Sequence, residues 1–91
     1  MPDNDIAELR VAARTPTDEL ASAIAHAIYD GRKPVLRAIG AGAVNQAVKG
    51  IIVASSYAAQ RGDVLACRPG FLTIPMDGEE RTAIVFNVVK V

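Results

Sequence analysis

The chain has 91 residues, enough for one domain with a small core but not for a second catalytic lobe or a full dinucleotide-binding fold. Apolar residues make up 51% of it and aromatic residues only 4%, so Ala, Val, Ile and Leu must build a closely packed interior. Ten basic and ten acidic side chains give a formal net charge of zero, which argues against a strongly basic protein that coats chromatin.

Charged side chains are unevenly distributed along the chain. Residues 1–31 carry six acidic side chains and two basic ones, whereas residues 32–68 carry six basic side chains and the single acid Asp63. This segregation predicts a local basic face on a protein that is neutral overall. The alternative is that these bases are solvated, or pair with the acids of the first segment.

Two features of the sequence bear on where the protein is found. No apolar run approaches the roughly 20 residues that span a bilayer, and the acidic N-terminus is unlike a signal peptide. We therefore expect a cytoplasmic protein without a membrane partner. The lone Cys67 has no partner for an internal disulfide, and its apolar, strand-like segment predicts a buried, inert thiol.

The first elements are predicted to be a strand and a helix. Residues 6–13 alternate between polar and apolar, as in a half-solvated strand. Thr15 is expected to cap a helix in which Pro16 takes the first position. Gly31 supplies the left-handed residue that commonly ends a helix, so the helix is predicted over 16–30. Its larger apolar residues recur every four positions, at Leu20, Ile24 and Ile28.

A second strand and a longer helix are predicted next. Residues 34–39 are mostly apolar, which suits a central strand, and the helix should begin near Gly42 and end at Arg61-Gly62. The apolar stripe expected on this helix comprises Val44, Ala47, Val48, Ile51, Ile52 and Ser55. Because a glycine inside a helix costs about 1 kcal/mol relative to Ala, Gly50 predicts the close approach of another backbone or subunit.

The C-terminal part is predicted to be a long β-hairpin. Residues 64–76 are strand-like with a break at Pro69-Gly70, and Asp77-Gly78 is a strong turn signal before a strand over 82–91. The last strand has apolar side chains on both faces, more than one layer of helices would cover. We therefore expect a homodimer or a larger homo-oligomer.

The candidate functional segment is Arg37–Lys49, where a strand passes through Gly40 and Gly42 into a helix. A helix that starts at glycines leaves several backbone N–H groups unpaired beside the positive end of the helix dipole, so this turn suits phosphate or another anion. Polar side chains follow within the first two turns, at Asn45, Gln46 and Lys49. In the structural alternative, the glycines serve close packing, and Asn45 and Gln46 cap the helix or fix a subunit interface.

Catalytic and metal-binding constellations are not evident. The chain has one histidine, His26, which is expected to be solvated, and one cysteine, so neither a nucleophilic triad nor a metal-ligand cluster can be assembled. Gly40-Ala-Gly42 followed by Asp63 is a weak dinucleotide fingerprint, since a third glycine would fall at Asn45. We therefore expect a protein that is not an enzyme and has no cofactor, metal or small-molecule substrate.

The order of the predicted elements, β-α-β-α-β-β, resembles that of the small Alba-like superfamily of nucleic-acid-binding proteins. Three segments are also similar to signature segments of the stage V sporulation protein S (SpoVS) family: Val11–Pro16, Ala38–Lys49 and Asp77–Ala83. The similarity covers residues 6–91, expected to be a single domain after a loose tail at residues 1–5. It implies an α+β two-layer sandwich, in which two helices cover one face of a four-stranded mixed sheet.

The resemblance also implies a function and a set of contacts. The function is that of a bacterial regulator of sporulation or development, assembled as a dimer or larger oligomer, that binds DNA or RNA. The alternative is a non-catalytic oligomeric scaffold or protein-interaction module without nucleic-acid binding. Arg14 is the first choice for a phosphate contact, because Alba-type proteins place basic residues at the end of the first strand.

Other positions depart from the Alba pattern. Where nucleic-acid-binding Alba proteins carry Arg or Lys, this chain has Gly40, Gly42 and neutral polar groups, so DNA coating of the Alba kind is in doubt. Further basic candidates for the site are Arg37, Arg68 and Arg81. Arg81 ranks last of these, because it follows two glutamates with which it can form a salt bridge at the hairpin.

Overall fold

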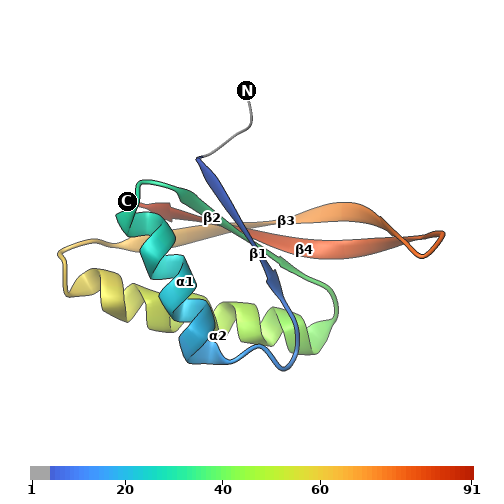
Figure 1. The fold of residues 1–91 in the computed structure, drawn as a ribbon, viewed down its shortest axis with the longest axis horizontal. Helices are drawn as coiled ribbons and strands as arrows, with labels where there is room; N and C mark the ends of the chain where they lie inside the picture. The colour runs from blue at the N-terminus through green and yellow to red at the C-terminus, as the bar shows by residue number, and fades with distance from the viewer. Residues whose placement is uncertain (1–4) are drawn as a thin grey trace.

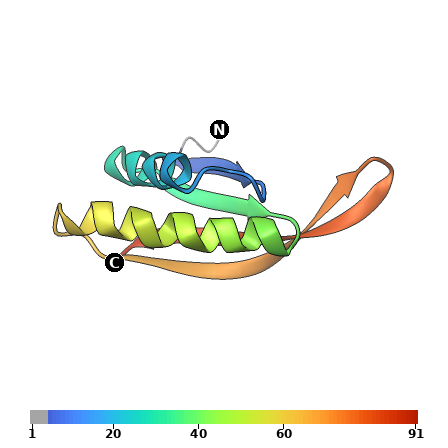
Figure 2. The ribbon, with the colours of Figure 1, turned by 90° about the horizontal axis from the view of Figure 1, so that it is seen from below.

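The computed structural model describes residues 5–91, which form six elements in the predicted order (Figure 1). These are β1 (Ile6–Val11), α1 (Thr17–Tyr29), β2 (Lys33–Ala38), α2 (Ala41–Ala59), β3 (Leu65–Met76) and β4 (Glu79–Lys90). The strands lie in the order β1-β2-β4-β3 in one sheet, and both helices pack on the same side of it (Figure 2). This arrangement confirms the predicted α+β sandwich with a four-stranded sheet.

The sheet is mixed and has two faces of different character. β1 is parallel to β2, and β4 is antiparallel to both β2 and β3. Because side chains alternate along a strand, Leu36 and its partner Phe86 point toward the helices, whereas Arg37 and its partner Val85 point away. We call these sides the helix face and the open face.

Small residues form the buried side of α2. They are Ala43, Ala47, Gly50, Ala54 and Ala58, and they allow α1 to lie close by. The predicted stripe of larger side chains is wrong in part, because Val48 is 41% exposed and Ile52 is 60% exposed. The largest fully buried side chains come from α1 and the sheet, at Ile24, Leu36, Val88 and Pro34. An alanine-lined helix therefore leaves some of its own branched residues on the surface.

The connection from β1 to α1 differs from the prediction. β1 ends at Val11 rather than at residue 13. Thr15 does not cap the helix: its hydroxyl oxygen accepts the N–H of Ala12 at 2.8 Å, which closes the loop before the helix. α1 starts at Thr17, after Pro16 in an extended conformation, and Gly31, with φ of 76°, follows its end as predicted.

The C-terminal hairpin is longer and more regular than predicted. β3 is not broken at Pro69-Gly70, because both residues stay in register with β4, opposite Phe86 and Val85. A proline is tolerated there because β3 lies at the edge of the sheet. Asp77 and Gly78 have positive φ and form the predicted turn, but β4 starts at Glu79, before residue 82. The hairpin projects beyond the N-terminal end of α2 (Figures 1 and 2).

Cys67 is exposed, so the prediction of a buried thiol is wrong. It lies on β3, most of whose side chains the two helices leave uncovered. Of the predicted N-terminal tail, residues 1–4 lie outside the described residues, and the carbonyl of Asp5 accepts the N–H of Lys33. Among residues 5–91, no helix is both long enough and apolar enough to cross a bilayer.

Candidate nucleic-acid interface

The loop between β1 and α1 packs directly on the first turn of α2. A Cβ atom at Gly42 would lie 2.8 Å from the Cβ of Ala13, closer than two such carbons can approach. Glycine at this position therefore lets the start of α2 touch the loop. We call this contact region, formed by residues 12–17 and 40–49, the loop–helix junction.

Gln46 links the two parts of the loop–helix junction by hydrogen bonds. Its Nε2 donates to the backbone oxygen of Thr15 at 2.7 Å and to the hydroxyl oxygen of Thr17 at 3.2 Å, and the side chain is partly buried. The amide donor of Gln46 is therefore satisfied within the protein. This contact matches the structural alternative for Gln46, although it bonds across to the loop and α1 rather than capping its own helix.

The N-terminus of α2 is open to an acceptor. Gly40 occupies the cap position with φ of 91°, and the first turn contains no acidic residue. Within the described part of the chain, no side chain forms a capping hydrogen bond there. The first intrahelical donor is the N–H of Val44, which bonds the carbonyl of Gly40. The N–H groups of residues 41–43 are therefore free of intrahelical partners and lie at the positive end of a 19-residue helix.

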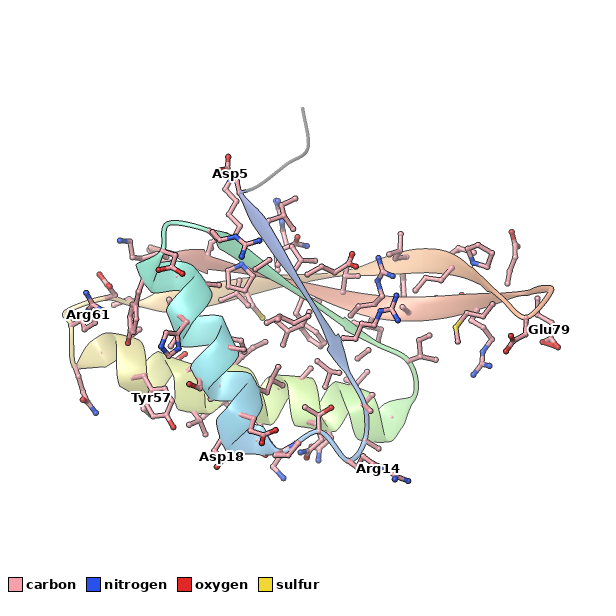
Figure 3. All side chains as sticks on the ribbon, viewed as in Figure 1. Asp5, Arg14, Asp18, Tyr57, Arg61 and Glu79 are labelled. Atoms are coloured by element: carbon pink, nitrogen blue, oxygen red, sulfur yellow. The ribbon has the colours of Figure 1, made fainter. Side chains whose placement is uncertain are left out.

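Three further polar side chains belong to the loop–helix junction, and of these Lys49 lies about two turns past the start of α2. Arg14, Asn45 and Lys49 are all exposed, and within residues 5–91 no hydrogen bond or ion pair holds any of them. Figure 3 shows Arg14 near the N-terminal end of α2 and directed outward. Asp18 and Glu19 follow directly after the loop, in the first turn of α1.

The remaining basic candidates lie elsewhere. By strand alternation, Arg37, Arg68 and Arg81 project from the open face, on the opposite side of the sheet from α2. Arg37 forms an ion pair with Glu8, with Nη2 2.7 Å from the carboxylate. The structure shows no ion pair between Arg81 and either of the two glutamates that precede it.

The predicted site therefore divides into two groups. The structure brings Arg14, Gly40, Gly42 and Gln46 together where the loop packs on the start of α2, and it places Asn45 and Lys49 farther along the same helix. It separates from them Arg37, Arg68 and Arg81. Other bases in the 32–68 segment are engaged in packing: the guanidinium of Arg61 lies 3.9 Å from the ring centroid of Tyr29, and Arg32 donates to the carbonyl of Ile6. The basic segment does not form one basic face.

Sequence analysis overlooked Arg10. It is the register partner of Arg37 in the parallel β1–β2 pair, so the two guanidinium groups project from the same face. The signal was available in the alternation of residues 6–11, where Glu8 and Arg10 share one side of the strand.

Titratable side chains do not gather into a metal site. Within residues 5–91, there is no group of three or more His, Cys, Asp or Glu side chains that could hold a metal ion. His26 is exposed, as predicted, and its Nδ1 lies 2.8 Å from the backbone oxygen of Ser22.

One family model matches nearly the whole chain. The family model described as stage V sporulation protein S (SpoVS) matches residues 7–91, which include all of α1 and α2 and nearly all of the sheet. The loop–helix junction and the hairpin turn both lie inside the matched region. The chain therefore belongs to the stage V sporulation protein S family and is a sporulation-related protein.

Proposed function

We propose that this sporulation-related protein is a non-enzymatic, cytoplasmic regulator that binds nucleic acid as a homo-oligomer, with its phosphate contacts at the loop–helix junction. The observation that carries the proposal is the position of Arg14. The packed junction holds this exposed, unpaired guanidinium beside the uncapped N-terminus of a long helix.

The chemistry of the junction suits phosphate. Backbone N–H groups at a helix N-terminus donate to phosphate oxygens, and the helix dipole favours the negative charge. Arg14 adds a planar donor set, and Lys49 adds a second charge farther along α2. Each junction contributes two cations, so log affinity should fall with log salt concentration at a slope of about −1.8 for each junction engaged on duplex DNA.

The open face is less suited to a phosphate backbone. Arg37 is already paired with Glu8. Arg81 lies opposite Ile74, six residues along β3 from Arg68, which separates the two arginines by roughly 20 Å. Arg68 and Arg81 would therefore meet phosphates as isolated charges, whereas Arg37, which has Arg10 beside it, is partly neutralised by Glu8.

Exposed apolar side chains support the homo-oligomer. Phe71 is 81% exposed, and by register with Ile84 it lies on the helix face of the sheet. Ile52 is 60% exposed on α2, on the same side of the sheet. A second copy that covers these side chains would remove them from water, and each added copy would bring another junction to the same nucleic acid. The second candidate function, an oligomeric scaffold without nucleic-acid binding, needs only this apolar surface.

Fluorescence anisotropy tests the phosphate contacts. Labelled single- and double-stranded DNA and RNA are titrated at two salt concentrations with the wild type, the Arg14→Ala/Lys49→Ala variant and a Lys33→Ala/Lys90→Ala control. The control removes the same charge from the start of β2 and the end of β4, away from the junction. We expect salt-sensitive binding that weakens at least tenfold in the first variant and little in the control.

Two outcomes would reject the junction as the interface. Equal loss of affinity in both double variants would mean that net charge alone drives binding. Absence of binding by the wild type at low salt would leave the oligomeric scaffold as the function.

A further inference from the structure

The open face is hollowed by a groove of about 430 Å³. The groove runs between the C-terminal ends of β1 and β2 and the far end of β3, near the hairpin turn. Its walls combine two arginines, Arg10 and Arg37, with the aliphatic side chains of Ile39, Ile74 and Met76. Its arginines project from the side of the sheet opposite α2, and its wall also includes Ala12 and Ala13, which the groove shares with the loop–helix junction.

The two arginines bring more positive charge than the protein neutralises. Glu8 accepts one hydrogen bond, from Nη2 of Arg37. Within the described chain no acidic side chain pairs with Arg10, which faces the groove beside Arg37. One carboxylate therefore faces two guanidinium groups, and the groove keeps a net positive charge.

Arg37 also has a donor without an acceptor. Its Nε is buried and has no hydrogen-bond partner among the described residues, although buried N–H groups of folded proteins nearly always have one. The Arg37 side chain as a whole is 24% exposed, so part of it still reaches solvent. A small anion between Arg10 and Arg37 would accept hydrogen bonds from the guanidinium N–H groups that Glu8 does not occupy.

The apolar walls of the groove indicate which chemical group the bound anion carries. The side chains that line the groove include no aromatic ring, so a nucleobase would have no aromatic surface on which to stack. Ile39, Ile74 and Met76 provide an aliphatic surface instead, and the volume lies within the range of small-molecule sites. We propose that this groove binds a small aliphatic carboxylate, with its head group on Arg10 and Arg37 and its chain along Ile39, Ile74 and Met76.

This ligand class goes beyond the proposed function and is independent of it. The probe is octanoate, used below its micellar concentration range, with methyl NMR spectra of the Ile and Met side chains as the readout. We expect saturable shifts of the methyl signals of Ile39, Ile74 and Met76. Acetate, which lacks the chain, and 1-octanol, which lacks the charge, should each bind at least tenfold more weakly.

Arg10→Gln is the informative variant, because it leaves the Arg37–Glu8 ion pair in place. It should weaken octanoate binding about tenfold, whereas Arg68→Gln, a matched change on the same face but outside the groove, should leave it unchanged. Circular dichroism establishes that both variants are folded.

Four outcomes would overturn the proposal, the first three of which concern affinity and the position of the shifts. They are equal affinity for octanoate and 1-octanol, shifts confined to Ile52 on α2, and unchanged affinity in Arg10→Gln. A fourth is a shift of the groove signals with protein concentration alone, which would show that a second copy of the chain occupies the groove.

Discussion

The side chain of Leu20 in α1 fills the space that a Cβ atom at Gly50 of α2 would need. An added Cβ would lie 2.5 Å from Cδ2 and 2.8 Å from Cγ of Leu20, which is itself only 4% exposed. Gly50→Ala should therefore destabilise the protein by about 1–2 kcal/mol in urea unfolding, because the cost of overpacking exceeds the gain of about 1 kcal/mol in helix propensity.

A double-mutant cycle separates these two contributions. In a Leu20→Ala background the clash is gone, so Gly50→Ala should become neutral or stabilising by up to about 1 kcal/mol. If Gly50→Ala stabilised the wild type by the same amount, the two helices would not be held at the distance seen here.

The contact between Gly42 and Ala13 supports a second prediction. Gly42→Ala should destabilise the fold by about 1–2 kcal/mol, because the new Cβ would lie 2.8 Å from that of Ala13. The reciprocal variant, Ala13→Gly/Gly42→Ala, moves the methyl group from one side of the contact to the other and should recover most of the loss. Urea unfolding of the two single variants and the double variant provides the comparison. Additive losses would argue against a direct contact.

Asn45 and Gln46 are adjacent in sequence but are expected to differ in their effects on stability. Gln46→Ala removes the two hydrogen bonds to Thr15 and Thr17 and leaves a backbone carbonyl with one partner fewer, so it should cost about 1–2 kcal/mol. Asn45→Ala alters an exposed side chain that has no hydrogen-bond partner among residues 5–91, so it should change the unfolding free energy by less than about 0.5 kcal/mol. Thermal or urea unfolding of the two variants side by side tests this difference. Similar losses in both would contradict it.

The strands and helices could be predicted because their signals are local. Alternation in β1, Gly31 after α1 and Asp77-Gly78 in the hairpin act within a few residues. The orientation of α2 could not be predicted in this way. Apolar periodicity predicts that Val48 and Ile52 are buried, whereas packing against Leu20 requires burial of the side of α2 that carries small residues. Burial of Cys67 was mispredicted for a related reason: it depends on how far the helices extend across the sheet.

The candidate site was predictable in part. The approach of Arg14 to the start of α2 follows from the element order, but its cause, the contact of Gly42 with Ala13, depends on tertiary packing. To predict that Arg37 and Arg68 lie apart from Lys49, one must know the strand register, which cannot be read from the sequence. Arg10 became a candidate only when the register placed it beside Arg37.

Phe71 and Ile52 provide a test of the proposed homo-oligomer. Burial of each of these side chains at an interface would contribute roughly 1.5–3 kcal/mol, so Ile52→Ser/Phe71→Ser should raise the dissociation constant of the oligomer at least tenfold. Both residues are exposed, so the stability of the single subunit should change little. Analytical ultracentrifugation over a range of protein concentrations measures the effect.

Val91→Ser is the matched control for this experiment, because Val91 is as exposed as Phe71, at 81%, but lies at the C-terminal end of the sheet. We expect Val91→Ser to sediment like the wild type. A parallel loss of association in Val91→Ser would place the interface at the end of the sheet instead. A wild type that stays monomeric at every concentration would remove the homo-oligomer from the proposed function, and phosphate binding would then depend on a single junction, without the gain from several copies.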